Sequence, residues 1–276
     1  PLSVSQLISA VLGTYQARFG LIFKVTALGT GTSVIGSAAM GLFPPALANL
    51  VVFASYPVGA ALFAALYACA FAAYRNERMT VYQAIQLGAR RALFVFALFI
   101  VISLAVTLPA MTIIGIPFAI AIAARWSLAI PATIAERLAV DRALGRSNSL
   151  VKKRTWRTLG IFALFTLVVW TPVSILTQVL YWRVLVNPNF YAVVEPVAEP
   201  VGGMFRSFGV AQVAASLVVM AAITLVTPLW VLLTTVLYVD YRDQEWEAVQ
   251  TVTTPDIFDT PRHLPRLPGG GDGLDI

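Results

Sequence analysis

Arg125 is the residue whose type and position most suggest chemistry. It interrupts an apolar run from Ile116 to about Ala135, and a charged side chain in the middle of such a run costs about 3 kcal/mol on insertion scales. The nearest carboxylate on that helix face, Glu136, lies about 16 Å farther along a continuous helix, so a direct pair is not expected. Two roles for the guanidinium stay open: contact with backbone carbonyls or a lipid phosphate, or contact with an anionic substrate.

The most charged stretch, residues 136–157, is a second group with ligand-binding potential. Apolar residues recur through it at helical spacing, which predicts a helix on the membrane surface. Its cations favour contact with anionic headgroups and control of membrane orientation over recognition of a phosphorylated ligand. The candidate lipid- or ligand-contacting residues are therefore Arg125, Arg146, Lys152, Lys153, Arg154 and Arg157.

Residue types that usually perform catalysis are sparse. His263, the only histidine, belongs to a proline-rich C-terminal segment, and Cys69, the only cysteine, lies within an apolar run. The sequence contains no glycine-rich phosphate loop, no nucleophile elbow and no paired carboxylates within an apolar segment. It therefore predicts no catalytic residues, no metal ligands and no cofactor, and we do not expect an enzyme.

The composition indicates lipid as the solvent for most of the chain. Hydrophobic residues make up 59% and charged residues 12% of the 276 positions, and the mean hydropathy is +0.81. The net charge of +6 could suggest nucleic acid, but the basic residues stand between apolar segments, where they would meet anionic headgroups. Membrane lipids, and not nucleic acid, are the expected partners.

Six apolar segments are long enough to cross a hydrocarbon core of about 30 Å, which needs about 20 residues per helix. They are expected at 21–43, 49–74, 92–109, 116–135, 158–182 and 210–239, the last with a tilt, a kink near Pro228 or a projection beyond the bilayer. Amphipathic surface helices are expected at 4–19, 80–91 and 136–157. The predicted fold is an all-α, polytopic integral membrane bundle.

Two segments fall outside this pattern. Residues 183–206 are broken by proline and glycine yet apolar, and we expect them on the outer membrane surface or against a neighbouring subunit. Residues 249–276 form a Pro/Gly-rich tail that should be ordered only by a partner. The predicted organisation is a transmembrane domain at 1–248 followed by this tail.

The distribution of Arg and Lys predicts the orientation. The loops on one side hold Arg75, Arg78, Arg90, Arg91, the basic residues of 136–157 and Arg242, whereas the other side holds only Arg183 and Arg206. By the positive-inside rule the richer side faces the cytoplasm, and so do both termini.

Two further patterns concern helix packing. A surface helix precedes a pair of spans three times, beginning near Val4, Val81 and Val140, which indicates a threefold repeat or three segments that are alike for physical reasons alone. Small residues recur every four positions at Gly29, Ser33, Ser37 and Gly41, and at Ala60, Ala64, Ala68 and Ala72. Such ladders favour close helix packing, and the alternative is a pore or substrate path lined by Thr32, Ser33 and Ser37.

The stretches RWSLAIPATIAERLAVDRALGRSNSLVKKRTWRTLG and TPLWVLLTTVLYVDYRDQ resemble the glycerophosphoryl diester phosphodiesterase membrane domain family. The matching residues are Arg125, Pro131, Glu136, Ala143, Leu144, Arg146, Ser147, Leu150, Trp156, Arg157, Pro228, Leu237, Tyr238, Asp240 and Arg242. The resemblance implies an integral protein of a prokaryotic membrane, here the bacterial cytoplasmic membrane. It does not imply the phosphodiesterase chemistry, which requires histidines and metal-binding carboxylates on a soluble barrel.

Two functions from different classes follow. The first is a non-enzymatic scaffold or accessory subunit of a larger membrane complex, which would have other membrane protein subunits as partners. The second is a transporter or lipid-handling protein for anionic ligands. Stoichiometric protein partners retained in mild detergent would favour the first, and saturable flux in proteoliposomes would favour the second.

Overall fold

The computed structural model describes residues 2–186 and 208–253, and it confirms the predicted all-α bundle. Six segments in these ranges are helical, long and apolar enough to cross a membrane: Phe19–Gly36, Ala46–Tyr74, Val81–Ala110, Ile116–Ala135, Thr155–Val179 and Val219–Trp246. The predictions for residues 187–207 and 254–276, His263 included, fall outside the described residues.

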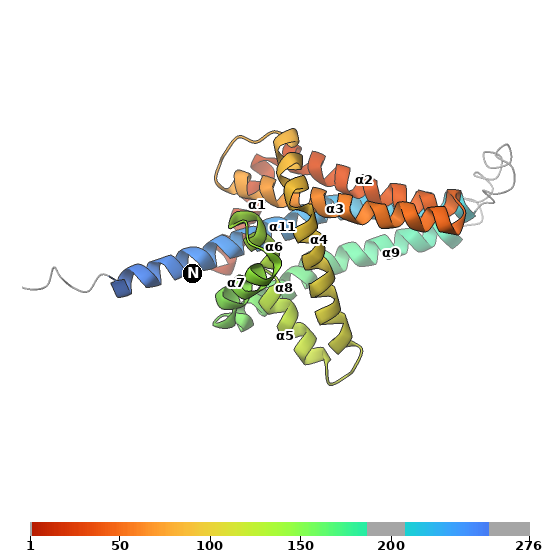
Figure 1. The fold of residues 1–276 in the computed structure, drawn as a ribbon. Helices are drawn as coiled ribbons and strands as arrows, with labels where there is room; N and C mark the ends of the chain where they lie inside the picture. The colour runs from red at the N-terminus through yellow and green to blue at the C-terminus, as the bar shows by residue number, and fades with distance from the viewer. Residues whose placement is uncertain (1, 187–207, 254–276) are drawn as a thin grey trace, which may run out of the picture.

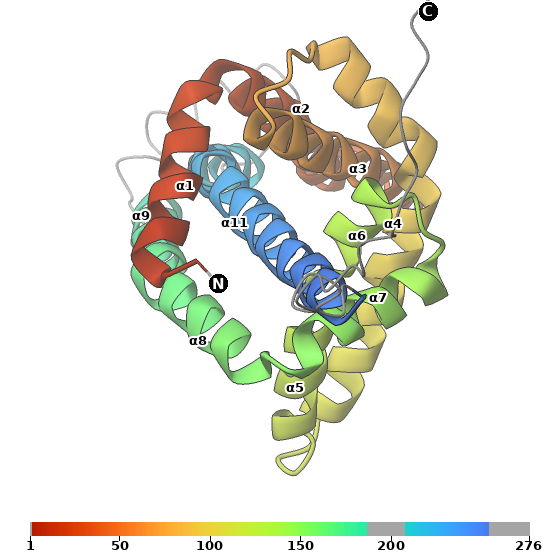
Figure 2. The ribbon, with the colours of Figure 1, turned by 90° about the vertical axis from the view of Figure 1, so that its left-hand side faces the viewer.

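The helices follow the chain in this order: α1 (Val4–Ala17), α2 (Phe19–Leu42), α3 (Pro45–Tyr74), α4 (Val81–Ala110), α5 (Ile116–Trp126), α6 (Ala129–Ala135), α7 (Val140–Lys152), α8 (Thr155–Phe165), the π-helical segment η1 (Thr166–Trp170), α9 (Thr171–Val186) and α11 (Phe208–Thr253). Seen along its length in Figure 2, α11 occupies the centre of the molecule. It contacts α1, α2, α3, α6, α7 and α9, so it organises the bundle.

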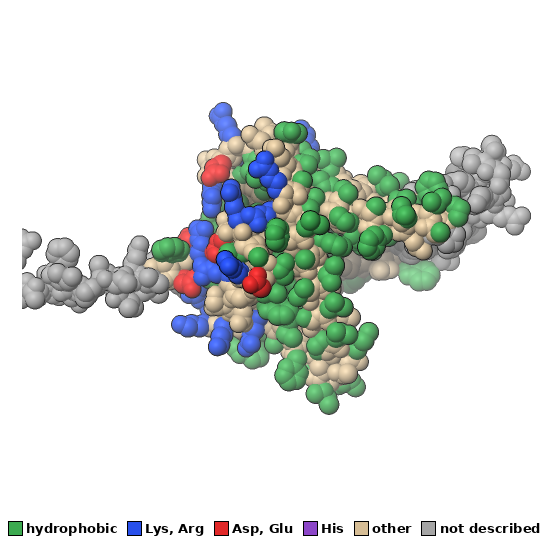
Figure 3. All heavy atoms as spheres, in the orientation of Figure 1, with side chains coloured by type: hydrophobic (Ala, Val, Ile, Leu, Met, Phe, Trp, Pro, Cys, Tyr) green, Lys and Arg blue, Asp and Glu red, His purple; other side chains and the backbone are tan. Residues whose placement is uncertain are grey.

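The bundle has two limbs that diverge from a common end. One limb contains α2, α3, α9 and the first part of α11, and the other is the hairpin of α4 and α5 (Figure 1). Lys and Arg side chains gather at the common end, while hydrophobic side chains cover the limbs (Figure 3). We call the common end the basic end. This segregation is typical of a membrane protein whose charged groups remain at one interface.

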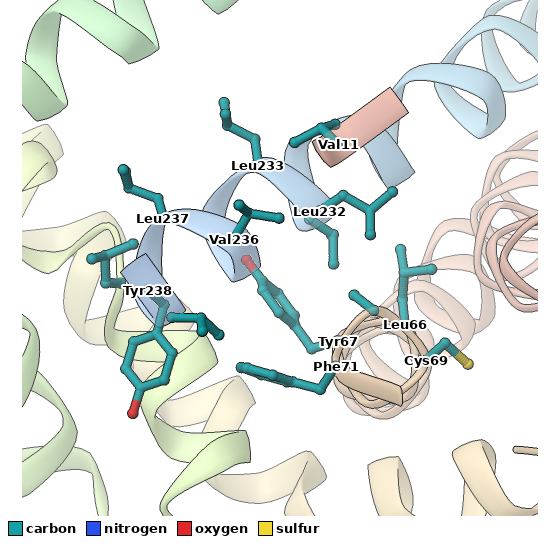
Figure 4. Packing of buried hydrophobic residues seen from close by; sticks show 14 of the residues in the cluster. Val11, Leu66, Tyr67, Cys69, Phe71, Leu232, Leu233, Val236, Leu237 and Tyr238 are labelled. Atoms are coloured by element: carbon teal, nitrogen blue, oxygen red, sulfur yellow. The ribbon is translucent and has the colours of Figure 1, made fainter. Parts of the chain in front are cut away.

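The core lies where α3 meets α11. Leu66 and Phe71 of α3 and Leu232, Val236 and Leu237 of α11 are buried there (Figure 4). Because lipid is as apolar as the helix surfaces, burial of apolar side chains does not favour helix association in a membrane. Tight packing and interhelical hydrogen bonds must therefore hold the helices together. Both are present in this core.

A buried hydrogen bond links the same two helices. The hydroxyl groups of Tyr67 in α3 and Thr234 in α11 are 3.0 Å apart, and the Tyr67 ring points from α3 toward α11 in Figure 4. Thr234 can share its own proton with carbonyls of its helix, because its Oγ1 lies 3.1 Å from the Trp230 carbonyl oxygen. The polar groups inside this apolar core are therefore satisfied.

Small residues bring α3 and α4 together, which agrees with the predicted ladder of small residues at Ala60, Ala64, Ala68 and Ala72. The closest contact involves Ala61 and Ala65, each of which follows a ladder position by one residue. A Cβ atom added to Gly88 would stand 2.2 Å from the Ala61 carbonyl oxygen and 2.7 Å from the Ala65 backbone nitrogen. Ala60 and Ala64 of the ladder are buried nearby with Val95. Only glycine permits this distance between the two backbones.

The three surface segments bury equivalent positions. Counted from Val4, Val81 and Val140, the residues at i+3 and i+7 are buried in each: Leu7 and Val11, Ala84 and Gly88, and Ala143 and Ser147. The first two segments also begin alike, since Ser3 with Gln6 and Thr80 with Gln83 form capping boxes. These shared features support a common register for the predicted repeat.

The first and third repeats bend at the same place. Arg18 separates α1 from α2 with φ −127° and ψ 23°, and Arg154 separates α7 from α8 with φ −131° and ψ 19°. The second repeat does not bend. The sequence predicts a separate surface helix at 80–91, whereas α4 is one helix from Val81 to Ala110.

Three other spans differ from the predicted ones. The fourth is divided between α5 and α6 by a turn at Ser127 and Leu128, and the fifth contains η1. The sixth is a single helix, α11, that passes through Pro228. Its end, Thr253, lies inside the segment that the sequence assigns to the tail, and α11 projects beyond the other helices at the basic end (Figure 1).

Candidate functional site

The turn between α5 and α6 is held by a side chain from α7. Ser147 is fully buried, and its Oγ donates to the Arg125 carbonyl oxygen at 2.7 Å and accepts from the Leu128 amide at 3.1 Å. These are backbone groups that the interruption of the helix leaves without an intrahelical partner. Ser147 thus ends α5 at a defined position and fixes α7 beside it.

We expect the Ser147→Ala variant to be less stable by about 2 kcal/mol, because two buried backbone groups lose their partner at once. Thermal unfolding of the purified protein, followed by tryptophan fluorescence, measures the loss. Ser149→Ala is the matched control on the same helix, since Ser149 is exposed and its Oγ bonds only the Arg146 carbonyl oxygen. Equal melting temperatures for the two variants would contradict the bridging role.

This turn places Arg125 at the basic end. Arg125 lies within the candidate span Ile116–Ala135, as the sequence predicts, and the structure puts it at the last turn of α5, exposed beside the junction of α7 and α8. Because Lys152 and Lys153 line the same pocket, we expect this guanidinium near the headgroups, where the insertion cost that singled it out is smaller. The position suits contact with an anion at the membrane surface.

A groove of about 810 Å³ lies between α5 and the α7–α8 junction. We call it the basic groove. It is lined by Pro117, Ile120, Ala121, Arg125, Lys152, Lys153, Arg154, Thr155, Trp156, Arg157 and Leu159. Five of the six candidate residues therefore come together in one concave site. Its volume is within the range of small-molecule and cofactor sites.

Three cations of the basic groove are available to a ligand. Arg125, Lys152 and Lys153 are exposed, and none of them makes an ion pair with another residue that the structure describes. Arg154 is partly engaged: its guanidinium carbon lies 4.9 Å from the centre of the Tyr241 ring. These four residues give the groove a strong positive potential.

Arg157 has a mainly structural role. Its Nη1 lies 3.3 Å from Oδ2 of Asp240, whose side chain is only 6% exposed. The Asp240 Oδ1 accepts from the Leu2 amide at 3.1 Å and from the Gln244 side-chain amide at 2.8 Å, and Arg157 also donates to the Leu2 carbonyl oxygen. This cluster joins the N-terminus, α8 and α11.

Arg146 is the candidate that the basic groove does not include. Its Nε lies 3.0 Å from Glu136 Oε1, and its Nη1 lies 2.5 Å from Glu245 Oε2. The Tyr238 hydroxyl donates to the same Glu136 oxygen. Burial lowers the pKa of Arg146, but the two carboxylates raise it more, so the net pKa is above its usual value. Arg146 remains a cation held between two helices that flank α7.

The structure thus divides the six candidates by role. Arg125, Lys152 and Lys153 line the basic groove as available cations, and Arg154 lines it while partly engaged by Tyr241. The charges of Arg146 and Arg157 are compensated by carboxylates. The carboxylates Glu136, Asp240 and Glu245 were not assigned this role from the sequence. Two of them could have been found from the sequence, because Glu136 and Asp240 are among the residues that carry the family resemblance.

The alternative path at Thr32 and Ser33 corresponds to another cavity. The two residues line a space of about 680 Å³ between α2, α3 and α4, with Phe53, Tyr56 and Phe99 among the other walls. The Ser37 side chain is outside the described residues. Most of the lining is aromatic or aliphatic, so the cavity has none of the fixed charge of the basic groove.

Comparison with models of protein families, with characterised proteins and with solved structures finds no match for this chain. The family resemblance therefore stays a prediction that rests on its own residues. Within the described residues, no three His, Cys, Asp or Glu side chains are grouped as a metal site would require.

Proposed function

We propose that this multi-pass membrane protein handles anionic lipids, which it binds through their headgroups at the basic groove. The observation that carries the proposal is the convergence of Arg125, Lys152, Lys153 and Arg154 from α5, α7 and the α7–α8 junction on one concave site. These cations have no carboxylate partner within the described residues, and a phosphate group in the groove would supply the opposite charge. Binding would be electrostatic and would weaken at high salt.

The shape of the basic groove suits a lipid better than a soluble anion. Its lining combines the cations with the apolar side chains of Pro117 and Ile120 on α5 and Leu159 on α8. A lipid can place its phosphate beside the cations and the first part of an acyl chain against the apolar side chains. A small hydrophilic anion would leave these side chains uncovered.

Trp156 supports the position of the groove at the membrane interface. It lies in the first turn of α8, next to the cations, and is 87% exposed. An indole ring is favoured at the level of the headgroups, where its apolar body and its N–H group are both accommodated. Because Lys and Arg gather at the basic end, we propose by the positive-inside rule that it faces the cytoplasm of a bacterium, with both termini on that side.

Loss of charge from the basic groove should weaken binding of anionic lipid. Each Lys or Arg near a negatively charged surface contributes about 1 kcal/mol, so we expect the double variant Lys152→Gln, Lys153→Gln to bind phosphatidylglycerol about 30-fold more weakly. Native mass spectrometry of the detergent-solubilised protein, titrated with phosphatidylglycerol or phosphatidylcholine, measures the occupancy of each lipid.

The matched control removes two exposed cations that do not line the groove, in the double variant Arg78→Gln, Arg142→Gln. Its affinity for phosphatidylglycerol should remain within a few fold of the unchanged protein. Equal losses in both double variants would mean that charge acts diffusely and not through the groove. Equal affinity of the unchanged protein for the two lipids would refute the proposed function.

The role as a scaffold or accessory subunit stays an alternative prediction. The same purification distinguishes it, because protein subunits retained in fixed ratio would indicate a complex. Lipid binding at the basic groove is compatible with either arrangement, whereas transport requires saturable flux of the lipid or anion in proteoliposomes.

A further inference from the structure

A second cationic pocket lies on the basic end, between α3, α4 and α6. It encloses about 590 Å³ and is lined by Ala64, Ala68, Phe71, Ala72, Arg75, Glu77, Met79, Leu87, Arg90, Arg91, Phe94, Ile134, Ala135 and Arg137. We call it the arginine pocket. It shares no lining residue with the basic groove, and we propose that it is a separate site that binds the phosphate group of a phosphorylated ligand.

The charges of the arginine pocket are unbalanced. Four arginines face a single carboxylate, Glu77, which lies 4.0 Å from Arg75. Arg90 and Arg137 are exposed, and neither makes an ion pair within the described residues. The Arg91 guanidinium carbon lies 5.5 Å from the centre of the Phe94 ring. Arginine binds the oxygens of both carboxylates and phosphates in a bidentate manner. Four guanidinium groups against one carboxylate match the nearly two negative charges of a phosphate monoester better than the single charge of a carboxylate.

The backbone at the rim is held in an unfavourable conformation. Two non-glycine residues in the described chain have a positive φ, Asn76 at 57° and Arg137 at 54°. Arg137 lines the pocket, and Asn76 lies between two residues that do. Asparagine tolerates this region, but an arginine there loses free energy, and such strain is concentrated at functional sites. The fold thus accepts a cost that places the Arg137 guanidinium at the pocket.

The rim is anchored from outside the pocket. The Asn76 side-chain oxygen accepts from Arg18 Nη2 at 3.1 Å, and Arg18 is the residue at which α1 bends into α2. The loop that carries Arg75 and Glu77 is therefore tied to another part of the bundle. This arrangement holds one side of the pocket in place before a ligand arrives.

The pocket is deep enough for the phosphate group to belong either to a lipid or to a soluble phosphate ester. Its α3 wall extends from Ala72 to Ala64, a distance of about 12 Å along the helix at 1.5 Å per residue. A lipid would place its phosphate among the arginines and apolar atoms along this wall. A soluble phosphate ester would occupy the rim alone. The chemistry recognised is the same, and the experiment separates the two.

The test uses the purified full chain in dodecyl maltoside. The melting temperature is measured with glycerol 3-phosphate, with dihexanoyl phosphatidic acid, and with glycerol and dihexanoylglycerol as the probes that lack phosphate. We expect a dose-dependent rise with at least one phosphate-bearing probe and none with its phosphate-free counterpart. A rise with glycerol 3-phosphate identifies a soluble source, and a rise with phosphatidic acid alone identifies a lipid. No rise with either phosphate-bearing probe would overturn the proposal.

Two variants assign the effect to the arginine pocket. Arg137→Gly removes the guanidinium while allowing the positive φ, so we expect an unchanged or higher melting temperature without ligand and at least tenfold weaker binding. Arg90→Gln removes an exposed, unpaired cation and should weaken binding by a similar factor. The variant Lys152→Gln, Lys153→Gln controls for the basic groove, which also attracts an anionic lipid. We expect it to keep a rise in melting temperature with the same probe, and this rise should be lost when Arg137→Gly is added.

The outcomes for the two sites are separable. If Arg137→Gly and Arg90→Gln both bind the phosphate probe as the unchanged protein does, the arginine pocket is not the site, whatever the basic groove binds. If the Lys152→Gln, Lys153→Gln variant loses the effect and the arginine variants retain it, the probe occupies the groove and the second site is refuted. Loss of phosphatidylglycerol binding in the groove variant leaves the arginine pocket as proposed.

Discussion

The Asp240→Ala variant should lose about 3 kcal/mol of unfolding free energy, one of the two largest effects that we expect for a single substitution. The Asp240 carboxylate is almost fully buried and pairs with Arg157, while its other oxygen accepts from Leu2 and Gln244. Removal of one partner from such a pair leaves the other charge without compensation, which usually costs several kcal/mol. The loss should also release the N-terminal residues from α11.

A double-mutant cycle measures the pair itself. Asp240→Ala, Arg157→Ala and the double variant are compared by thermal or detergent-induced unfolding, and we expect a coupling energy of about 2 kcal/mol. Asp243→Ala is the control, because Asp243 pairs with Arg242 at 3.1 Å but is 56% exposed. That exposed pair should contribute less than about 1 kcal/mol. Additive effects of the two single variants would show that the buried pair does not stabilise the fold.

The second large effect is expected for Gly88→Ala, at about 3 kcal/mol of lost stability. The new methyl group would meet the Ala61 carbonyl oxygen at 2.2 Å, and the atom in its way is backbone, which cannot rotate aside. Helices α3 and α4 would have to separate, with the loss of contacts around Ala65. Overpacking of this kind outweighs the higher helix propensity of alanine, which favours the substitution by about 1 kcal/mol.

Gly145→Ala provides the matched control for this prediction. Gly145 lies within α7, and a Cβ atom added to it would meet nothing within 4 Å. We therefore expect Gly145→Ala to raise stability by about 0.5–1 kcal/mol through helix propensity alone. Melting temperatures that shift in opposite directions for the two variants would support the close contact. A Gly88→Ala variant as stable as the unchanged protein would contradict it.

These two expectations concern the contacts that position the proposed sites. Asp240 holds Arg157, and Arg157 borders the basic groove next to Arg154. Gly88 brings α4 against α3, the two helices that supply most of the arginine pocket. A loss of stability in either variant should therefore be accompanied by weaker ligand binding. The charge variants Lys152→Gln, Lys153→Gln and Arg90→Gln should affect binding without a comparable loss of stability.

The spans could be predicted because their signal is local. A helix that crosses a hydrocarbon layer needs about 20 consecutive apolar residues and internal hydrogen bonding, and both requirements are met within one segment of chain. The same holds for the surface segments that begin near Val4 and Val140, where apolar residues recur at helical spacing. Boundaries were less predictable. The junction near Ala92 continues as helix in α4, and the turn at Ser127 depends on a side chain from α7.

The site was only partly predictable, since charge content is local but pairing is not. The sequence by itself determined that cations cluster at 136–157 and that Arg125 is exceptional in its run. Only the tertiary structure decided which cations remain available, because Glu245 approaches Arg146 and Asp240 approaches Arg157 from α11, far along the chain. It also decided that Arg75, Arg90, Arg91 and Arg137, from three helices and their loops, line one pocket. Membrane insertion depends on the apolar content of each segment, whereas a site depends on which faces of distant helices meet, and helix packing alone sets that.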